Sequence, residues 1–303
     1  MADDGKAKIA VVGAGLMGHG IAQVFALAGH EVKITDTVVK NLDTVASRIA
    51  ANLRDLGEDE SAVERVQPSV DLTDAVHDAD YVVEAVSENL ELKKKLFAEL
   101  ERRTRPDTIL ASNTSVIPIT AIMQDLSRRE RAVGTHWWNP PFLVPLVEVI
   151  GTQWTSPKVI ATTMALHAAA GKTPAHVKKD VPGFIGNRLQ HALWREAIAL
   201  VEHGICDAKT VDDVVKASFG RRLAVLGPIE NADQVGTDLT LAIHDIVLPA
   251  IENRPGPSPY LQDLVTNGKL GFKSGEGFQK WSPEQQAALR ARVMRHLKAM
   301  RDT

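Results

Sequence analysis

The first half of the chain alternates short apolar runs with longer amphipathic stretches. Apolar runs at residues 9–12, 32–35, 81–86 and 108–111 predict buried strands, and apolar positions recur with helical spacing over residues 16–28 and 90–101. The alternation continues to residue 150. It is typical of an α/β fold of the Rossmann type, a doubly wound and mostly parallel sheet with helices on both faces.

The pattern changes at Val181-Pro182-Gly183. Proline holds the residue before it in an extended conformation, and the glycine lets the backbone change direction. Beyond this point helical spacing dominates, most clearly over residues 185–202, and strand signals almost disappear. We therefore predict two domains, an α/β domain at residues 1–183 and a mostly α-helical C-terminal domain at residues 184–303.

A glycine-rich motif, Gly13-Ala14-Gly15-Leu16-Met17-Gly18, follows the first predicted strand and opens the first predicted helix. In this context the first glycine permits a tight turn, the second lets the backbone approach a pyrophosphate, and the third allows close helix–strand packing. The unpaired N–H groups of the helix N-terminus favour the same anion. Three glycines can simply form a turn, but the strand and helix around them favour a dinucleotide site.

Asp36 ends the second predicted strand, where the βαβ unit opened by the glycine motif closes. An acidic side chain at this position accepts hydrogen bonds from ribose hydroxyls. Because a carboxylate repels a 2′-phosphate, Asp36 favours NAD over NADP, although Lys33 and Lys40 lie close to it in the sequence.

A histidine and a glutamate occupy two further strand-like segments. His136 follows the apolar run at residues 131–135, and Glu148 is the one carboxylate inside the apolar segment 143–150. If the two segments fold back about Phe142, these residues face each other. A glutamate that accepts a hydrogen bond from one ring nitrogen leaves the other nitrogen free to take a proton from a substrate. The pattern alone leaves open whether this histidine is catalytic or structural.

Ser115 and Asn187 are further polar candidates. Ser115 lies just beyond the carboxyl end of a predicted strand, the edge at which doubly wound sheets bind ligands, and Asn187 lies one helical turn beyond the predicted boundary. A turn before Pro118 and a solvated helix position are the alternative interpretations. Trp137 and Trp138 are either core residues or walls of a substrate pocket next to the histidine.

Composition narrows the function classes. The 303 residues are 44% hydrophobic and 24% charged, with a formal net charge of −3 and no cluster of basic residues, which disfavours nucleic acid and anionic membranes as partners. Cys206 is the single cysteine and no His-Glu-x-x-His motif occurs, so we predict no metal site. No apolar run reaches the roughly 20 residues of a membrane span, and the N-terminal segment lacks a signal-peptide pattern. We expect a cytoplasmic protein that acts on a small molecule.

Taken in order, these segments resemble the 3-hydroxyacyl-CoA dehydrogenase family. The similarity spans nearly the whole chain and rests on the glycine motif together with Val82-Val83-Glu84-Ala85-Val86, Ser112-Asn113-Thr114-Ser115, His136 to Pro140, Pro145-Leu146-Val147-Glu148-Val149, Asp180-Val181-Pro182-Gly183-Phe184 with Asn187-Arg188, and Lys273-Ser274-Gly275-Glu276-Gly277-Phe278.

The resemblance implies an NAD-dependent dehydrogenase acting on the CH–OH group of its donor. It implies that His136 is the general base in alcohol oxidation, that Glu148 orients it, and that Ser115 and Asn187 contact the substrate oxygen. It also implies that the helical C-terminal domain forms a homodimer. Four further positions match residues that help to hold the dinucleotide: Glu88, Lys93, Asn139 and Lys273.

Several departures resemble a branch of the family that handles small free acids, such as L-gulonate 3-dehydrogenase, carnitine 3-dehydrogenase and the pyridine-alcohol dehydrogenase of vitamin B6 degradation. Trp137-Trp138 replace two phenylalanines usual in the acyl-CoA enzymes. The acid-rich segment 52–66 lacks the lysines common around the helix that contacts CoA, and we expect its negative charge to repel the CoA phosphates. We therefore expect a 3-hydroxy acid or similar small carboxylated alcohol as substrate, with Trp137, Trp138 and Arg188 as its contacts.

Three alternatives stay open at this point. The segment Leu270-Gly271-Phe272-Lys273-Ser274-Gly275 resembles the acyl-CoA enzymes, which favours an L-3-hydroxyacyl-CoA substrate such as 3-hydroxybutyryl-CoA. A non-catalytic NAD-binding structural protein or redox sensor would not need a base together with a carboxylate that orients it. A β-hydroxyacid dehydrogenase with a catalytic lysine would share little beyond the glycine turn.

Overall fold

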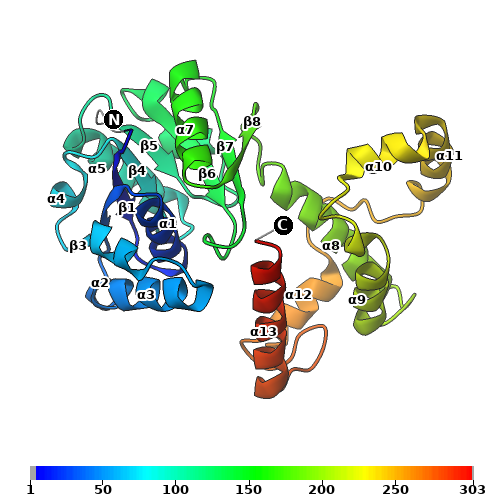
Figure 1. Cartoon of the computed structure of the whole chain (residues 1–303). Helices are drawn as coiled ribbons and strands as arrows, with labels where there is room; N and C mark the ends of the chain where they lie inside the picture. The colour runs from blue at the N-terminus through cyan, green and yellow to red at the C-terminus, as the bar shows by residue number, and fades with distance from the viewer. Residues whose placement is uncertain (1–4, 302–303) are drawn as a thin grey trace. The chain divides into compact units, whose positions relative to one another are not determined.

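Two compact units make up the chain. The computed structural model describes residues 5–301, and Figure 1 shows its elements coloured in chain order. The first unit runs to Arg188 and includes the described residues from His296 onward, whereas the second comprises Leu189–Arg295. The domain boundary after residue 183 remains a prediction. Helix α8 (Gly186–Glu202) is continuous through the point at which the two units divide.

A single sheet organises the first unit. Its strand order is β3-β2-β1-β4-β5-β6-β7-β8, and the pairing is parallel except between β6 and β7. The predicted doubly wound α/β fold is therefore confirmed. The strands of this sheet are β1 Lys8–Val12, β2 Glu31–Thr35, β3 Val66–Ser69, β4 Tyr81–Glu84, β5 Ile109–Ser112, β6 Ala132–Trp137, β7 Leu146–Ile150 and β8 Thr173–Val177.

The two edge strands, β3 and β8, carry no apolar run that predicts them. Each contains a proline, Pro68 in β3 and Pro174 in β8, which an edge strand tolerates because one side of its backbone needs no partner. The central strands are buried on both faces, so their sequences are almost continuously apolar.

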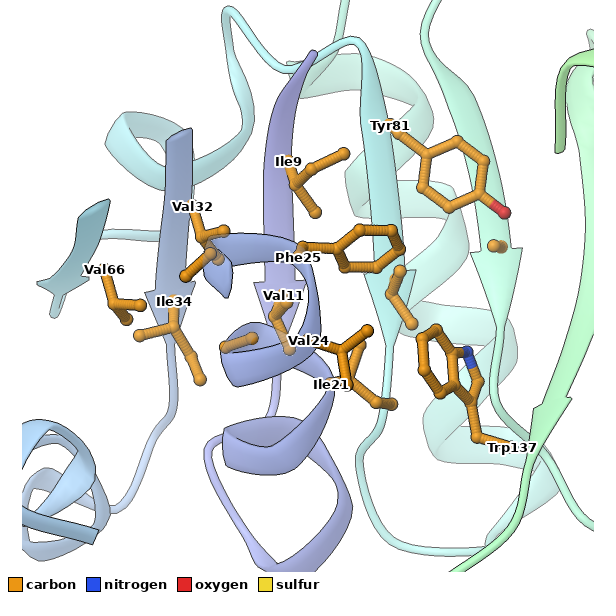
Figure 2. Close-up of a cluster of buried hydrophobic side chains, with 14 of the residues drawn as sticks. Ile9, Val11, Ile21, Val24, Phe25, Val32, Ile34, Val66, Tyr81 and Trp137 are labelled. Atoms are coloured by element: carbon orange, nitrogen blue, oxygen red, sulfur yellow. The ribbon is translucent and has the colours of Figure 1, made fainter. Parts of the chain in front are cut away.

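Helices cover both faces of the sheet. One face packs against α1, α3 and α7, and the other packs against α4, α5 and α6. Figure 2 shows the first of these cores, in which Phe25 of α1 lies over β1 and near Tyr81 and Trp137. The helices of this unit are α1 Leu16–Leu27, α2 Val39–Asp43, α3 Val45–Leu56, α4 Leu72–Val76, α5 Leu90–Arg103, α6 Ile119–Met123 and α7 Pro157–Ala169, with 3-10 turns η1 Glu60–Arg65 and η2 Arg129–Arg131.

The second unit is helical, as the pattern beyond residue 184 predicts. It contains most of α8, then α9 Ala208–Ala217, η3 Phe219–Arg221, α10 Pro228–Val235, α11 Thr237–Val247, α12 Pro259–Thr266 and most of α13 Pro283–Ala299. Its strand pairing within the described residues is limited to isolated bridges near Glu276. Between residues 5 and 301, no helix is both long and apolar enough to cross a bilayer.

Candidate active site

The strand order places a topological switch point at the carboxyl end of the sheet. β1 lies between β2 and β4, so the chain leaves the first strand toward one side of the sheet and returns on the other. In open α/β sheets this switch point is where ligands bind. The glycine motif follows β1 directly, and the segments that follow β4 and β5 lie beside it.

The three glycines of the motif have distinct spatial constraints. Gly13 has a φ of +105°, and a Cβ there would lie 2.6 Å from the carbonyl oxygen of Ala85. A Cβ on Gly18 would lie 1.7 Å from the carbonyl oxygen of Gly13, whereas a Cβ on Gly15 would meet no atom within 4 Å. The first and third glycines therefore permit the turn and the packing. The second leaves open space at the start of α1, where a pyrophosphate fits.

Leu16 and Met17 complete the motif at the first turn of α1. The Leu16 side chain is exposed, and Met17 is partly buried against the core between the sheet and helices α1, α3 and α7. No side chain caps this helix N-terminus, which suits the binding of an external anion.

Asp36 lies directly beyond β2 and is already engaged by backbone groups. One carboxylate oxygen accepts from Ala14 N (2.7 Å) and Asn41 Nδ2 (3.0 Å), and the other accepts from Val38 N (2.8 Å). Partial burial alone would raise the pKa of Asp36, but these hydrogen bonds and the charge of Arg48 hold it below its usual value. An ionised carboxylate here fits ribose hydroxyls and repels a 2′-phosphate.

A largely buried network of ion pairs and hydrogen bonds connects the segments after β4 and β5. The Lys93 ammonium lies 2.6 Å from Glu84 Oε1 and 3.3 Å from Glu88 Oε2, and the Glu84 and Lys93 side chains are at most 1% exposed. Glu84 also accepts from the Ser112 hydroxyl, and Glu88 accepts from the Thr114 hydroxyl, both at 2.6 Å. Burial would raise the pKa of Glu88, but these partners lower it.

Glu84 was missed as a functional candidate by sequence reasoning. It is a lone carboxylate in an otherwise apolar strand, the same signal that marked Glu148, and a buried carboxylate requires partners. The structure also shows that Lys93, expected at the dinucleotide, points into this network rather than to the surface. Glu88 is the more accessible member, with 38% of its side chain exposed.

His136 and Glu148 face each other across β6 and β7. The antiparallel register pairs these two residues directly, as folding back about Phe142 predicts. His136 Nδ1 lies 2.7 Å from Glu148 Oε2, and both side chains are buried. The other carboxylate oxygen accepts from the backbone N–H groups of Ile185 (2.8 Å) and Gly186 (3.0 Å), at the start of α8.

These contacts keep the Glu148 carboxylate ionised. Burial would raise its pKa, but the hydrogen bonds from His136, Gly186 and Ile185 outweigh burial and lower the pKa. A carboxylate on Nδ1 fixes the imidazole in the tautomer whose Nε2 is an acceptor. This arrangement makes Nε2 of His136 able to take a proton.

Two aromatic rings flank the imidazole. The ring centroids of Trp138 and Phe184 lie 5.3 and 5.6 Å from that of His136. Trp138 packs against Gly186, where a Cβ would lie 2.5 Å from Trp138 Cζ2. Phe184 has a φ of +52°, an unfavourable conformation for a bulky residue that places its ring beside the histidine.

Ser115 and Asn187 lie together in the structure. Asn187 Nδ2 donates to the carbonyl oxygen of Ser115 at 2.8 Å, although the two residues are far apart in the sequence. The Ser115 N–H in turn donates to Glu88 Oε1 at 2.9 Å. These contacts join the residues after β5 to the start of α8.

Asn113 is a further residue near the site that sequence reasoning missed. Its side-chain Oδ1 accepts a hydrogen bond from the backbone N–H of Trp137 at 3.0 Å.

Trp137 does not lie with the other predicted substrate contacts. It occupies the opposite face of β6 from His136, is 2% exposed, and packs against Phe25 and His167 in the core. Consecutive strand residues point to opposite faces, which is the physical reason for this placement. Its expected contact with a substrate therefore gains no support, whereas Trp138 lies beside the histidine.

The remaining candidates lie at the edges of the first unit or in the second. Arg188 is exposed, and no carboxylate among residues 5–301 forms an ion pair with its guanidinium. Asn139 is exposed in the loop after β6. Lys273 belongs to the second unit, next to the bridge that joins Gly271 to Glu276. No group of three or more potential metal ligands occurs in the part of the chain that the structure describes.

Comparison with known proteins identifies the two halves of the chain. Residues 8–181 match the NAD binding domain of 3-hydroxyacyl-CoA dehydrogenase, and residues 183–281 match the C-terminal domain of the same family. The chain is 37% identical to 5-formyl-3-hydroxy-2-methylpyridine 4-carboxylate 5-dehydrogenase of Mesorhizobium japonicum, covering 97% of this chain and 96% of that protein. It is 38% identical to a probable 3-hydroxybutyryl-CoA dehydrogenase of Deinococcus radiodurans, covering 90% of this chain and all of that protein.

A solved structure agrees with the first of these relatives. The crystal structure of the 5-formyl-3-hydroxy-2-methylpyridine 4-carboxylic acid 5-dehydrogenase, an NAD+-dependent dismutase, superposes with a TM-score of 0.91 at 36% identity. The superposition covers 98% of this chain and 97% of the chain in the crystal structure. These matches show that the chain belongs to the 3-hydroxyacyl-CoA dehydrogenase family and is an NAD-dependent oxidoreductase.

Proposed function

We propose that this enzyme interconverts a small carboxylated alcohol and its carbonyl form, with His136 as the general base and Glu148 as the residue that orients it. The 2.7 Å contact between His136 Nδ1 and Glu148 Oε2 carries this proposal. It commits Nδ1 to the carboxylate, so Nε2 is the nitrogen that takes the hydroxyl proton during oxidation and returns it during reduction.

The surrounding residues position the substrate oxygen. Ser115 and Asn187 are held together by the 2.8 Å hydrogen bond between them, at the carboxyl end of β5 where a ligand is expected. We infer that the Ser115 hydroxyl and the Asn187 side chain contact the substrate oxygen beside His136. Bound NAD+ supplies the hydride acceptor, and the protein contributes position and polarity.

The cofactor is held by the glycine cradle, Asp36 and the loops after β4 and β6. We propose that Gly13, Gly15, Leu16, Met17 and Gly18 hold the pyrophosphate and that Asp36 accepts from the ribose. Glu88 and Asn139 are exposed enough to reach the dinucleotide directly. Lys93 is buried with Glu84, so we assign it the indirect role of holding Glu88 in place. Lys273 stays a proposed contact.

Three observations favour a small free acid over a CoA thioester. Trp138 narrows the surroundings of His136, and Arg188 is an exposed cation without an ion-pair partner among residues 5–301, suited to a carboxylate. In addition, the Mesorhizobium relative, which acts on a pyridine carboxylate, matches almost the full chain, whereas the Deinococcus relative covers 90% of it.

Ion pairs within the chain weaken the predicted electrostatic repulsion between segment 52–66 and CoA. Acidic residues of segment 52–66 were expected to repel the phosphates of CoA. Several of them already form ion pairs within the chain, Glu60 with Arg54, Asp55 with Lys298 and Glu58 with Arg301. Because these pairs offset much of the negative charge, repulsion alone does not decide the substrate.

Replacement of His136 tests the proposed chemistry. We expect His136→Gln to lower kcat by about 10²–10⁴, the usual contribution of a general base, while the Kd for NADH stays within twofold. His176→Gln, which alters an exposed histidine in β8, is the matched control and should retain wild-type kcat. A near-normal kcat in His136→Gln would refute the assignment.

A substrate panel tests the substrate class separately. NADH formation is measured with 5-formyl-3-hydroxy-2-methylpyridine 4-carboxylate, the corresponding hydroxymethyl compound, L-gulonate, carnitine and 3-hydroxybutyryl-CoA. A kcat/KM for a free acid that exceeds that of the thioester by several decades supports the proposal. The opposite order would make this an L-3-hydroxyacyl-CoA dehydrogenase, and no turnover with NADH binding intact would favour a structural protein or redox sensor.

We further propose that the enzyme is a cytoplasmic homodimer that binds neither nucleic acid nor membranes. Helices α9, α10 and α11 have no buried residue, and large apolar side chains on them are exposed, including Val214, Ile229, Leu241 and Ile246. Apolar helix faces of this extent favour burial by a second copy. Analytical ultracentrifugation tests this proposal, and a monomer at micromolar concentration would contradict it.

A further inference from the structure

Arg48 of α3 contacts the glycine loop. Its Nη2 donates to the carbonyl oxygens of Ala14 (2.7 Å) and Asn41 (2.9 Å), and its Nη1 donates to that of Gly15 (3.4 Å). The planar guanidinium presents several donors in a fixed fork, which suits it to hold several carbonyls at once. The side chain is only partly exposed, and its contacts with the loop come from a helix that follows the βαβ unit.

Arg48 and Asp36 close a ring of hydrogen bonds around the loop. Asp36 accepts from the N–H of Ala14, whose carbonyl accepts from Arg48. Arg48 also donates to the carbonyl of Asn41, whose side-chain amide returns to Asp36. Ala14 is therefore held at both of its backbone polar groups, and the cation of Arg48 lies close enough to lower the pKa of Asp36.

The contacts of Arg48 with the loop bear on the direction of two backbone N–H groups. In a trans peptide the N–H points away from the preceding carbonyl. Arg48 holds the carbonyl of Ala14 and adds a longer contact to that of Gly15, which His19 also contacts through its backbone N (3.3 Å) and Nδ1 (2.8 Å). The N–H groups of Gly15 and Leu16 therefore point to the opposite side. Beside Gly15 there is open space, because a Cβ there would meet no atom within 4 Å.

We propose that Arg48 is a positioning residue of the cofactor site, which aims the N–H groups of Gly15 and Leu16 at the pyrophosphate of the dinucleotide. Stability alone does not account for the arginine. Its Nε is buried without a hydrogen-bond partner among residues 5–301, an unfavourable arrangement that a methionine of similar length would avoid. The inference concerns NAD binding and does not depend on the identity of the alcohol substrate.

Binding of NADH to the full-length enzyme tests this proposal. Fluorescence titration should give a Kd that is about tenfold higher for Arg48→Met, with a smaller increase for Arg48→Lys, which keeps the charge but loses the fork. The kcat at saturating NAD+ should stay within about threefold, because His136 is untouched. Arg54→Met on the same helix, which removes an exposed pair with Glu60, should leave the Kd unchanged.

A double-mutant cycle with Asp36→Asn tests the ring itself. Because both residues hold Ala14, we expect the combined effect on the NADH Kd to be smaller than the product of the two single effects. Effects that multiply independently would contradict the ring. A Kd within threefold of the wild-type value in both Arg48 variants would overturn the proposal, even if their melting temperatures fall, and the Arg48→Lys variant decides if Arg48→Met does not fold.

Discussion

Replacement of Glu148 by glutamine removes one acceptor from a site that uses two. One carboxylate oxygen accepts the Nδ1 proton of His136, and the other accepts from the N–H groups of Ile185 and Gly186. Glutamine has a single oxygen and an NH2 group that cannot accept. The side chain must therefore choose which donors to satisfy, and it does so with almost no change in size.

The number of donors on each side decides which orientation the glutamine side chain favours. If the glutamine oxygen turns to His136, two partly buried backbone N–H groups lose their acceptor, at a cost of at most ~1–3 kcal/mol each. If the oxygen stays with Ile185 and Gly186, the NH2 group faces Nδ1 and donates to it. His136 then carries its proton on Nε2, so the nitrogen expected to act as the base is blocked.

We therefore expect Glu148→Gln to retain its fold and to lose about 10²–10⁴ in kcat, because the tautomer is wrong and the positive charge formed on His136 is no longer neutralised. Steady-state NADH formation gives kcat, fluorescence titration gives the NADH Kd, and ¹⁵N chemical shifts of the imidazole report the tautomer. The NADH Kd should stay within twofold of the wild-type value.

Glu99→Gln is the matched control, since Glu99 is half-exposed on α5 and its ion pairs within residues 5–301 are with the neighbouring Arg102 and Arg103. It should leave kcat unchanged. A Glu148→Gln enzyme with kcat within about threefold of the wild type, or with the proton still on Nδ1 of His136, would refute the reasoning.

Three other predictions follow from packing and charge. Gly15→Ala should keep the wild-type melting temperature but weaken NADH binding at least tenfold, whereas Gly18→Ala, whose Cβ would lie 1.7 Å from a carbonyl oxygen, should lower the melting temperature by several degrees. Equal melting temperatures in the two variants would contradict this distinction. Burial lowers the pKa of His167 to about 4, so the unfolded chain binds a proton between about pH 6.5 and 4 that the folded protein excludes. The free energy of unfolding should fall by ~3 kcal/mol as the pH drops through this window. In His167→Phe this pH dependence should be shallower, and an unchanged dependence would contradict the assignment to His167. Phe25→Ala should cost ~3–5 kcal/mol in chemical denaturation, since its fully buried ring packs against four other aromatic rings, and a loss below ~1 kcal/mol would argue against this packing.

Patterns that depend on neighbours in the chain were predictable from the sequence. The central strands are buried on both faces and therefore read as apolar runs, and the glycine motif marks the turn after β1 because only glycine fits two of its positions. The facing of His136 and Glu148 also followed, since the register of a simple hairpin depends only on where the chain folds back. The cofactor class needed little more than these local signals, whereas the fold class rested on them together with a resemblance, and the family came from the resemblance of several ordered motifs along the chain.

Contacts between distant segments were decided by the tertiary structure alone. The sequence does not show that Lys93 turns inward to Glu84, that Arg48 reaches back to the glycine loop, or that the start of α8 donates to Glu148. Such contacts depend on where a long side chain finds an opposite charge or an acceptor after the strands have paired, and many positions on a helix satisfy the same local pattern. For that reason the sequence determined the sheet and the kind of chemistry, whereas the tertiary structure decided which distant side chains and backbone groups contact one another around the candidate site.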